Sequence, residues 1–146
     1  MLKLIGMGGT FDHLHKGHKF LIETALSLSQ EVHIGLANQE MLKNKKFASK
    51  IENYETRKKN LKDFINSVSA SNRVKIIELN NPYGPPIDDP KYVGIIVSQE
   101  TYNGALKINE IRENKGFKPL IIIVIPMILG ENNQKISSTS IREKLI

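Results

Sequence analysis

The run from Gly8 to His18 holds the residues most capable of chemistry in this chain. Two histidines, His15 and His18, flank a Lys-Gly pair between a short apolar segment and a helical pattern. Imidazoles and the main-chain amides of a helix N-terminus can converge on a single anion. The run therefore predicts a phosphate site, and that geometry suits nucleotide chemistry.

A second group of candidate phosphate ligands lies near the end of the chain. Hydroxyl groups cluster just before a predicted helix, with an arginine one turn into it: Ser137, Ser138, Thr139, Ser140 and Arg142. Hydroxyls and helix amides together can hold phosphate oxygens. Taken alone, the segment also fits simple helix capping, because Ser140 and Glu143 have the spacing of a capping box. A lysine-rich stretch, 41–50, is a third candidate.

Alternating apolar segments and helical patterns must position these residues. Strands are predicted over 2–7, 31–37, 73–79, 92–98 and 120–125, and helices from Gly17, around 61–68, over 104–115 and at the C-terminus. The order predicts an α/β fold: a single Rossmann-like domain over 1–146 with a five-stranded, mostly parallel sheet and helices on both faces. All three candidate segments follow strands, so they would gather at the carboxyl edge, where such folds bind ligands.

Composition narrows the class of protein. The chain has no cysteine, which excludes disulfides and thiolate catalysis. Its net charge of +6 comes mainly from lysine, with only four arginines and no interleaved aromatic residues, so we expect no nucleic-acid partner. The longest apolar run, 120–129, is too short to span a membrane. The N-terminus also lacks the pattern of a signal peptide, so a cytoplasmic location is expected, and the oligomeric state stays open.

The two terminal motifs together carry a family resemblance. Gly9-Thr10-Phe11-Asp12 with His15-Lys16-Gly17-His18, and the segment 136–142, resemble the paired signatures of the HxGH nucleotidyltransferase superfamily. Between them, the segments 81–85 and 97–109 resemble the archaeal-type phosphopantetheine adenylyltransferases and the matching domain of eukaryotic CoA synthase. The resemblance covers nearly the whole chain.

The resemblance implies transfer of an adenylyl group from ATP to 4'-phosphopantetheine, giving dephospho-CoA and pyrophosphate. An acceptor phosphate is already a nucleophile, so such an enzyme must align two polyanions and stabilise developing charge. Other members of the superfamily remain alternatives: a nicotinamide mononucleotide adenylyltransferase, a FAD synthase or a phospho-alcohol cytidylyltransferase. A non-catalytic nucleotide-binding regulator is a further alternative, although the intact histidine motif argues against it.

The resemblance also implies a set of site residues. The catalytic groups would be His15, His18 and Lys43, with Lys45 or Lys46 in reserve. The ATP phosphates would lie against Gly8, Gly9, Thr10, Phe11, Gly17, Ser137, Ser138, Thr139, Ser140 and Arg142, with Thr10 positioning the attacking phosphate. Further candidates for nucleotide or acceptor contacts are Arg57, Lys107 and Arg112, although Arg57 could instead pair with a carboxylate such as Glu55.

Mg²⁺ would be bound mainly through ATP, because the sequence has no evident carboxylate cluster for a metal site of its own. The chain departs from the bacterial enzyme, which has threonine in place of His15. His13 and His33 match no motif position, and ordinary surface or strand roles are expected for them. Tyr83 and Tyr102 could line the pantetheine or adenine pocket, or pack against their own loops.

Overall fold

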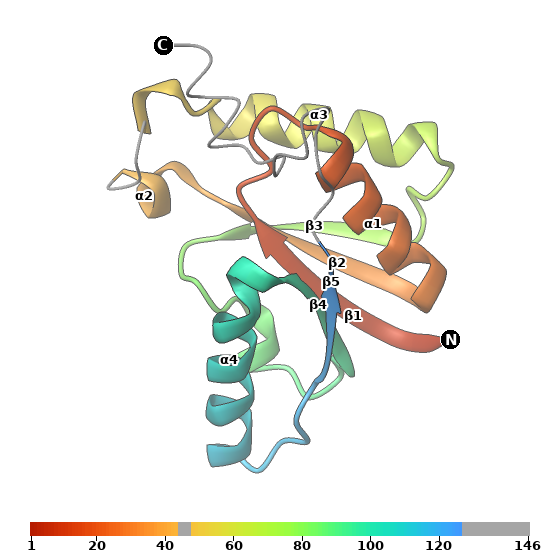
Figure 1. Cartoon of the computed structure of the whole chain (residues 1–146), viewed down its shortest axis with the longest axis vertical. Coiled ribbons are helices and arrows are strands. Elements are labelled where there is room, and N and C mark those ends of the chain that lie inside the picture. The colour runs from red at the N-terminus through yellow and green to blue at the C-terminus, as the bar shows by residue number, and fades with distance from the viewer. Residues whose placement is uncertain (44–47, 127–146) are drawn as a thin grey trace.

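A computed structural model describes residues 1–43 and 48–126 of the chain. One sheet contains β1 (Leu2–Gly9), β2 (Ser29–Ala37), β3 (Val74–Leu79), β4 (Gly94–Ser98) and β5 (Ile121–Ile125). The strand order is β3-β2-β1-β4-β5 (Figure 1), and every pairing among these strands is parallel. The predicted Rossmann-like α/β architecture is confirmed, with a sheet that is fully parallel over the described residues.

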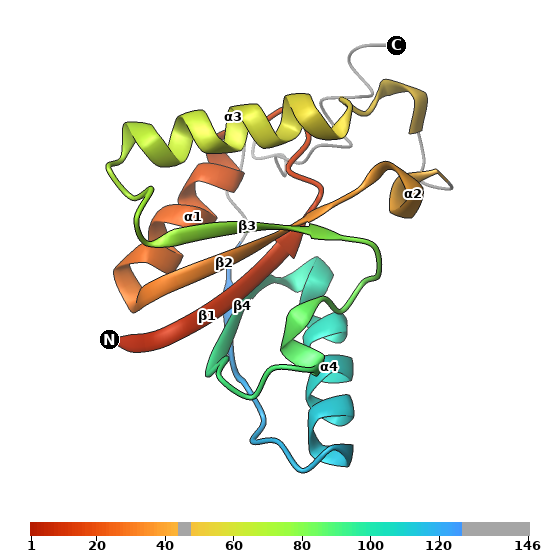
Figure 2. The same cartoon turned by 180° about the vertical axis from the view of Figure 1, so that it is seen from behind.

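Helices cover both faces of the sheet. Figures 1 and 2 show α1 (Lys16–Leu28) and α3 (Tyr54–Ser67) on one face and α4 (Tyr102–Asn114) on the other. The remaining elements are short: α2 (Gln39–Leu42) and the 3-10 turns η1 (Ala48–Lys50), η2 (Pro85–Ile87) and η3 (Gln99–Thr101). Within the described residues, no helix is long and apolar enough to cross a membrane.

The alternation of side chains along β1 separates two parts of the core. Ile5 and Met7 pack with the buried residues of α1 and α3, whereas Leu4 packs with the cluster beneath α4. Successive residues of a strand point to opposite faces. Gly6 and Gly8 therefore share the α4 face with Leu4. Because they are glycines, no side chain projects from them on that face of the strand.

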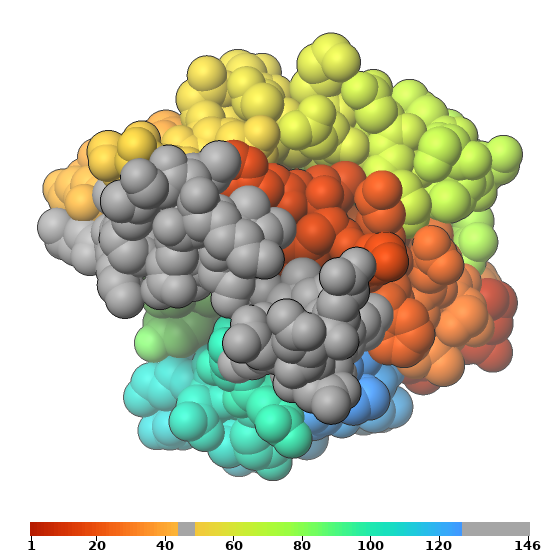
Figure 3. Space-filling model, turned by 45° about the horizontal axis from the view of Figure 1, so that its top comes forward, coloured from red at the N-terminus to blue at the C-terminus, as the bar shows by residue number. Residues whose placement is uncertain are grey.

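The order in which successive strands join the sheet changes direction at β1. From β1 it continues to β2 and β3 on one side, and then crosses to β4 and β5 on the other. The connections at such a switch point diverge, which opens a crevice beyond the carboxyl ends of the strands. Figure 3, which looks onto this end of the molecule, shows the orange surface of α1 beside the yellow and green surface of α3.

Candidate functional site

His15 and His18 form a reciprocal cap at the start of α1. His15 is the N-cap residue, and its Nδ1 accepts a hydrogen bond from the Gly17 amide at 3.1 Å. His18 Nδ1 accepts from the His15 amide at 3.3 Å. The two rings stack with their centroids 3.8 Å apart. The histidines therefore do have a local structural role, and His15 takes up an amide that the sequence analysis had assigned to the anion.

These bonds decide which nitrogens can donate to a ligand. A neutral imidazole has one N–H and one acceptor nitrogen, so an Nδ1 that accepts leaves the proton on Nε2. Burial lowers the pKa of His15, and burial together with the charge of His15 lowers the pKa of His18 to about 3. Both rings are thus neutral Nε2–H donors near pH 7. His15 Nε2 is buried, and no residue of the described chain accepts its hydrogen bond.

Gly17 and Phe11 hold this pair in place. A Cβ on Gly17 would lie 3.0 Å from His15 Cε1, tighter than nine in ten real Cβ contacts, so a larger residue there would press on the stacked ring. Phe11 is 3% exposed, and its ring centroid lies 5.2 Å from that of His18. Its φ of 50° is in the left-handed region, which places the side chain in the core rather than toward a ligand.

Arg57 ties together the loops that follow β1 and β2. It is fully buried, and its Nη1 donates to the carbonyl oxygens of Thr10 at 3.0 Å and Ala37 at 2.7 Å. Its Nε donates to the Glu52 carbonyl at 2.9 Å and its Nη2 to Gln39 Oε1 at 2.6 Å. The sequence predicts for Arg57 either a phosphate contact or a pair with a carboxylate such as Glu55. The structure shows hydrogen bonds to loop atoms in place of both. Arg57 positions the site without facing the ligand.

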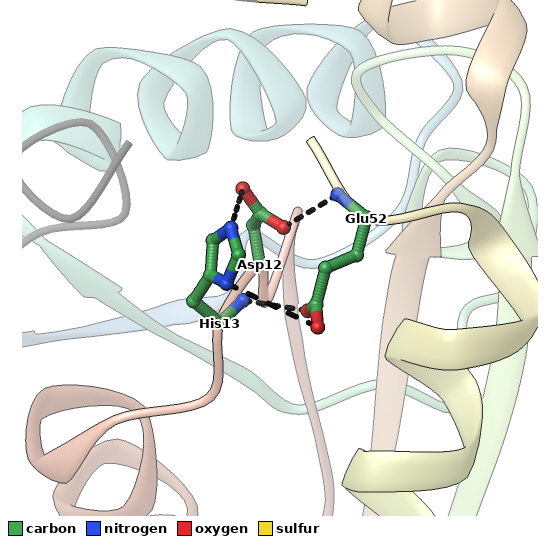
Figure 4. A group of neighbouring side chains, drawn as sticks. All are labelled: Asp12, His13 and Glu52. Carbon is green, nitrogen blue, oxygen red and sulfur yellow. Dashed lines mark hydrogen bonds and ion pairs between the residues drawn. The ribbon is translucent and has the colours of Figure 1, made fainter. Parts of the chain in front are cut away.

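Asp12, His13 and Glu52 form a second polar group beside the histidine segment (Figure 4). One ligand atom from each lies within 4.8 Å of the others, so the group could hold a metal ion. Asp12 Oδ1 accepts from the Glu52 amide at 2.9 Å, and Glu52 Oε1 accepts from the His13 amide at 2.8 Å. The sequence analysis expected no such carboxylate cluster, because Asp12 and Glu52 lie 40 residues apart.

A cavity of about 410 Å³ lies on the α4 face of the sheet and begins at the end of β1. Gly8, Gly9 and Thr10 line its carboxyl end, and the other lining residues come mainly from α2, β2, β3, β4, α4 and the segment from Pro82 to Pro86. The lining is mostly apolar. At Gly35 a Cβ would lie 2.7 Å from Leu79, so the packed floor of the cavity requires a residue without a side chain.

The remaining predicted residues lie elsewhere. Lys43 ends α2 at the carboxyl edge, where its exposed Nζ pairs with Glu40 Oε1 at 2.6 Å. Lys107 is exposed on α4, pairs with Glu110 and is not among the residues that line the cavity. Ser137, Ser138, Thr139, Ser140 and Arg142 lie outside the described residues, as do Lys45 and Lys46.

Arg112 corrects the sequence interpretation. It is 1% exposed, and its guanidinium donates to main-chain carbonyls at Pro86, Asp89, Tyr92 and Lys118. Tyr92 precedes β4, so these contacts lie at the amino edge of the sheet, opposite the phosphate segment. A contact with nucleotide or acceptor was therefore a wrong assignment, and Arg112 anchors the loop before β4.

His33 and Tyr92 were not recognised as site residues. Both line the cavity, and His33 Nδ1 lies 2.7 Å from the Tyr92 hydroxyl. Tyr83 also lines the cavity, whereas Tyr102 is 39% exposed and is not among the lining residues. The available signal was the alternation of β2, which puts His33 on the face that the glycines of β1 leave open.

Comparisons with known proteins show to which family the chain belongs. The cytidylyltransferase-like family model matches residues 7–144. A phosphopantetheine adenylyltransferase of Pyrococcus abyssi is 46% identical over 144 residues, which cover 99% of this chain and 91% of the relative. A relative of the same name from Methanosarcina barkeri is 41% identical over 140 residues, covering 94% of this chain and 84% of the relative.

A solved structure extends the comparison to the fold. A protein of unknown function from Archaeoglobus fulgidus is 31% identical, with a TM-score of 0.75 over 86% of this chain and 99% of that one. The chain therefore belongs to the cytidylyltransferase-like family, and within it to the phosphopantetheine adenylyltransferases.

Proposed function

We propose that this protein transfers the adenylyl group of ATP to 4'-phosphopantetheine, giving dephospho-CoA and pyrophosphate in coenzyme A biosynthesis. One observation carries the proposal. A pair of neutral imidazole donors and a largely apolar cavity meet at the end of β1, in a chain 46% identical to a phosphopantetheine adenylyltransferase. The first feature suits a phosphate chain and the second suits an organic arm.

The reaction exchanges one phosphorus–oxygen bond for another. An oxygen of the acceptor phosphate attacks the α-phosphorus of ATP, and the bond from that phosphorus to the β-bridging oxygen breaks. Pyrophosphate leaves with the electron pair, so negative charge grows on the oxygens around the α-phosphorus and on the leaving group. We assign the Nε2–H groups of His15 and His18 to these oxygens, since fixed donors are most useful where charge develops.

Because His15 and His18 are neutral, they supply directed hydrogen bonds to the phosphates but no positive charge. Lys43 is the proposed mobile cation, because its pair with Glu40 is exposed and such pairs contribute only about 0–1 kcal/mol. Mg²⁺, when bound, neutralises part of the charge on the ATP phosphates. We propose that the ion is held mainly by ATP oxygens, and that the Asp12 and Glu52 carboxylates, each of which accepts one main-chain amide hydrogen bond, chiefly hold the loops beside it.

Thr10 lies where the two sites join. It lines the cavity, and its carbonyl is fixed by Arg57. We propose that the acceptor phosphate binds at Thr10 with its organic arm in the cavity, and that Gly8, Gly9 and Gly17 allow the phosphates to approach. Following the family motif, the hydroxyls of 137–140 and Arg142 would hold the β- and γ-phosphates. We propose that both substrates are small molecules that bind to a single domain, 1–146. The reaction is proposed to take place in the cytoplasm.

A substrate panel tests the assignment. Purified protein with ATP and Mg²⁺ should release pyrophosphate with 4'-phosphopantetheine. Nicotinamide mononucleotide, FMN and glycerol phosphate should give far slower turnover, because none of them has an amide-containing arm to fill the largely apolar cavity. The measurement is coupled pyrophosphate release, with dephospho-CoA identified by mass. Faster turnover on any of the other three acceptors would overturn the proposed substrate.

A further inference from the structure

A hydrogen-bonded pair lies at the inner end of the cavity, away from the phosphate segment. The Tyr92 hydroxyl is 2.7 Å from His33 Nδ1, and the other ring nitrogen, Nε2, contacts Glu31 Oε2. Tyr92 is 3% exposed and the His33 side chain is 14% exposed, whereas the Glu31 side chain is 54% exposed. These hydrogen-bonded residues therefore extend from solvent, at Glu31, into a mostly apolar cavity, at Tyr92.

The register of the sheet gives the distance between this pair and Thr10. His33 is paired with Gly6 across β1 and β2, and the Tyr92 ring lies 3.5 Å from the position of a Cβ on Gly6. Thr10 follows Gly6 by four residues along an extended strand. At about 3.3 Å per residue, the two ends of the cavity are roughly 13 Å apart.

The contacts also fix the direction of the hydrogen bonds. The Glu31 carboxylate can only accept, so His33 donates from Nε2, and in the tautomer that carries its proton there Nδ1 is an acceptor. The Tyr92 hydroxyl donates its proton to that nitrogen. Burial, with smaller effects of Asp89 and Glu31, raises the pKa of Tyr92 to about 12, so the phenol stays protonated at neutral pH. Its oxygen keeps lone pairs that can accept from a ligand in the cavity.

We infer that the Tyr92 hydroxyl, oriented by His33 and Glu31, accepts a hydrogen bond from the amide N–H nearest the thiol of the acceptor arm and thereby selects the acceptor. The inference rests on the proposed function. In 4'-phosphopantetheine that nitrogen lies about ten covalent bonds from phosphorus, and an extended chain advances about 3.3–3.6 Å for every three bonds. The span of roughly 11–12 Å fits the separation between Thr10 and the pair.

Tyr92 would select the acceptor because an arm without this N–H donates no hydrogen bond to the Tyr92 oxygen. 4'-Phosphopantothenate ends in a carboxylate where 4'-phosphopantetheine has this amide. It brings no donor to the Tyr92 oxygen, and it brings a negative charge toward Glu31. A site built to pair with an N–H discriminates against an analogue that lacks one, because the accepting lone pairs of the buried hydroxyl oxygen then receive no hydrogen bond from the ligand. His33 and Glu31 act as positioning residues for Tyr92.

Tyr92→Phe tests the inference while keeping the ring over Gly6 and the Tyr92 carbonyl that Arg112 binds. The KM for 4'-phosphopantetheine should rise about fivefold to tenfold, with kcat and the KM for ATP changed by less than about twofold. The ratio of kcat/KM for 4'-phosphopantetheine to that for 4'-phosphopantothenate should fall by the same factor. Tyr102→Phe is the matched control, since Tyr102 is exposed on α4 and does not line the cavity. Its kinetics should be unchanged.

A double-mutant cycle separates positioning from direct contact. His33→Ala should raise the KM for 4'-phosphopantetheine by less than Tyr92→Phe, and the double variant should match Tyr92→Phe alone. Unchanged discrimination in Tyr92→Phe, or equal losses on both acceptors with a lower Tm, would overturn the inference. An inactive wild-type protein would overturn the proposed function with it, whereas an active wild type with an unaltered Tyr92→Phe variant overturns the inference alone.

Discussion

At the residue scale, the site is organised by where each imidazole carries its proton. The amides of His15 and Gly17 occupy the two Nδ1 atoms, and burial keeps the rings neutral. An imidazolium in this position would lose those amide hydrogen bonds, because its Nδ1 becomes a donor. The arrangement thus favours fixed, neutral donors over positive charge, which is why Lys43 and Mg²⁺ are proposed to balance the charge of the phosphates.

His18→Ala should lower kcat about 100-fold to 1000-fold with a smaller change in the KM for ATP. The proposed hydrogen bond strengthens as charge develops on the α-phosphate, so its loss is felt mainly in the transition state. Steady-state kinetics with both substrates varied make the measurement. His18→Gln, which keeps a side-chain N–H, should recover part of the rate. An unchanged kcat with a raised KM would mean that His18 only binds ATP.

The lowered pKa of His18 predicts a pH dependence of stability. The unfolded chain takes up a proton on this residue below about pH 6.5, whereas the folded protein does so only near pH 3. Protonation therefore favours unfolding, and the free energy of unfolding should fall as the pH drops between these values, by at most about 1.4 kcal/mol per pH unit from this group.

Urea unfolding from about pH 7.5 to pH 4.5 measures this effect as a difference between wild type and His18→Gln. The variant lacks the titrating ring, so its free energy of unfolding should fall less steeply over that range. Parallel curves for the two proteins would contradict the shifted pKa.

At the scale of elements, β1 and β2 end in loops that a single guanidinium joins. Arg57 projects from the first turn of α3 and bonds to carbonyls after both strands. Its hydrogen bonds go to polar groups of three loop segments, and the Ala37 carbonyl among them belongs to a buried residue. Helix α3 thereby fixes the position of Thr10 relative to His15 and His18.

Arg57→Lys should lower the free energy of unfolding by about 2–4 kcal/mol, because one ammonium cannot reproduce four directed hydrogen bonds. It should also lower kcat/KM at temperatures where the variant is still folded, since Thr10 loses its anchor. Urea unfolding and steady-state kinetics make the two measurements.

Lys107→Ala serves as the control for Arg57→Lys, because Lys107 pairs only with Glu110 at the surface among the described residues. Its stability should stay within about 0.5 kcal/mol of wild type, with normal activity. A stable Arg57→Lys protein with normal kinetics would remove Arg57 from the positioning of the site.

At the scale of the whole molecule, the fold gives two ligand regions to one strand end. The histidine pair lies toward the α1 face, and the cavity lies on the α4 face. Gly8, Gly9 and Thr10 connect them, since the chain passes between the faces where β1 ends. A product that occupies both regions should therefore bind better than either half.

Dephospho-CoA at about 100 times its Kd should raise the Tm by roughly 5–10 °C, since binding to the folded state alone contributes about 2.7 kcal/mol. A thermal melt followed by circular dichroism measures the shift, with inorganic phosphate at the same concentration as the control. A shift no larger than that of phosphate would mean that the cavity does not take the pantetheine arm.

Periodicity and turn residues were enough to predict the order of the elements and the parallel sheet. Each described strand lies within three residues of its predicted ends, because strand and helix patterns are local properties of the chain. Arg57 and Arg112 could not be interpreted correctly in the same way. Whether an arginine faces a phosphate or a buried carbonyl depends on which loop packs over it, and no local pattern records that.

Local spacings along the chain were enough to predict the phosphate segment with its two histidines, the alternation of strands and helices, and the family. These follow from short spacings that act within one turn or one strand. Only the tertiary structure joined Asp12 to Glu52, 40 residues away, and His33 to Tyr92, 59 residues away. Such pairs depend on strand register and on the packing of loops against helices. The His33–Tyr92 pair lines the cavity, at the place where we infer that the acceptor arm is selected.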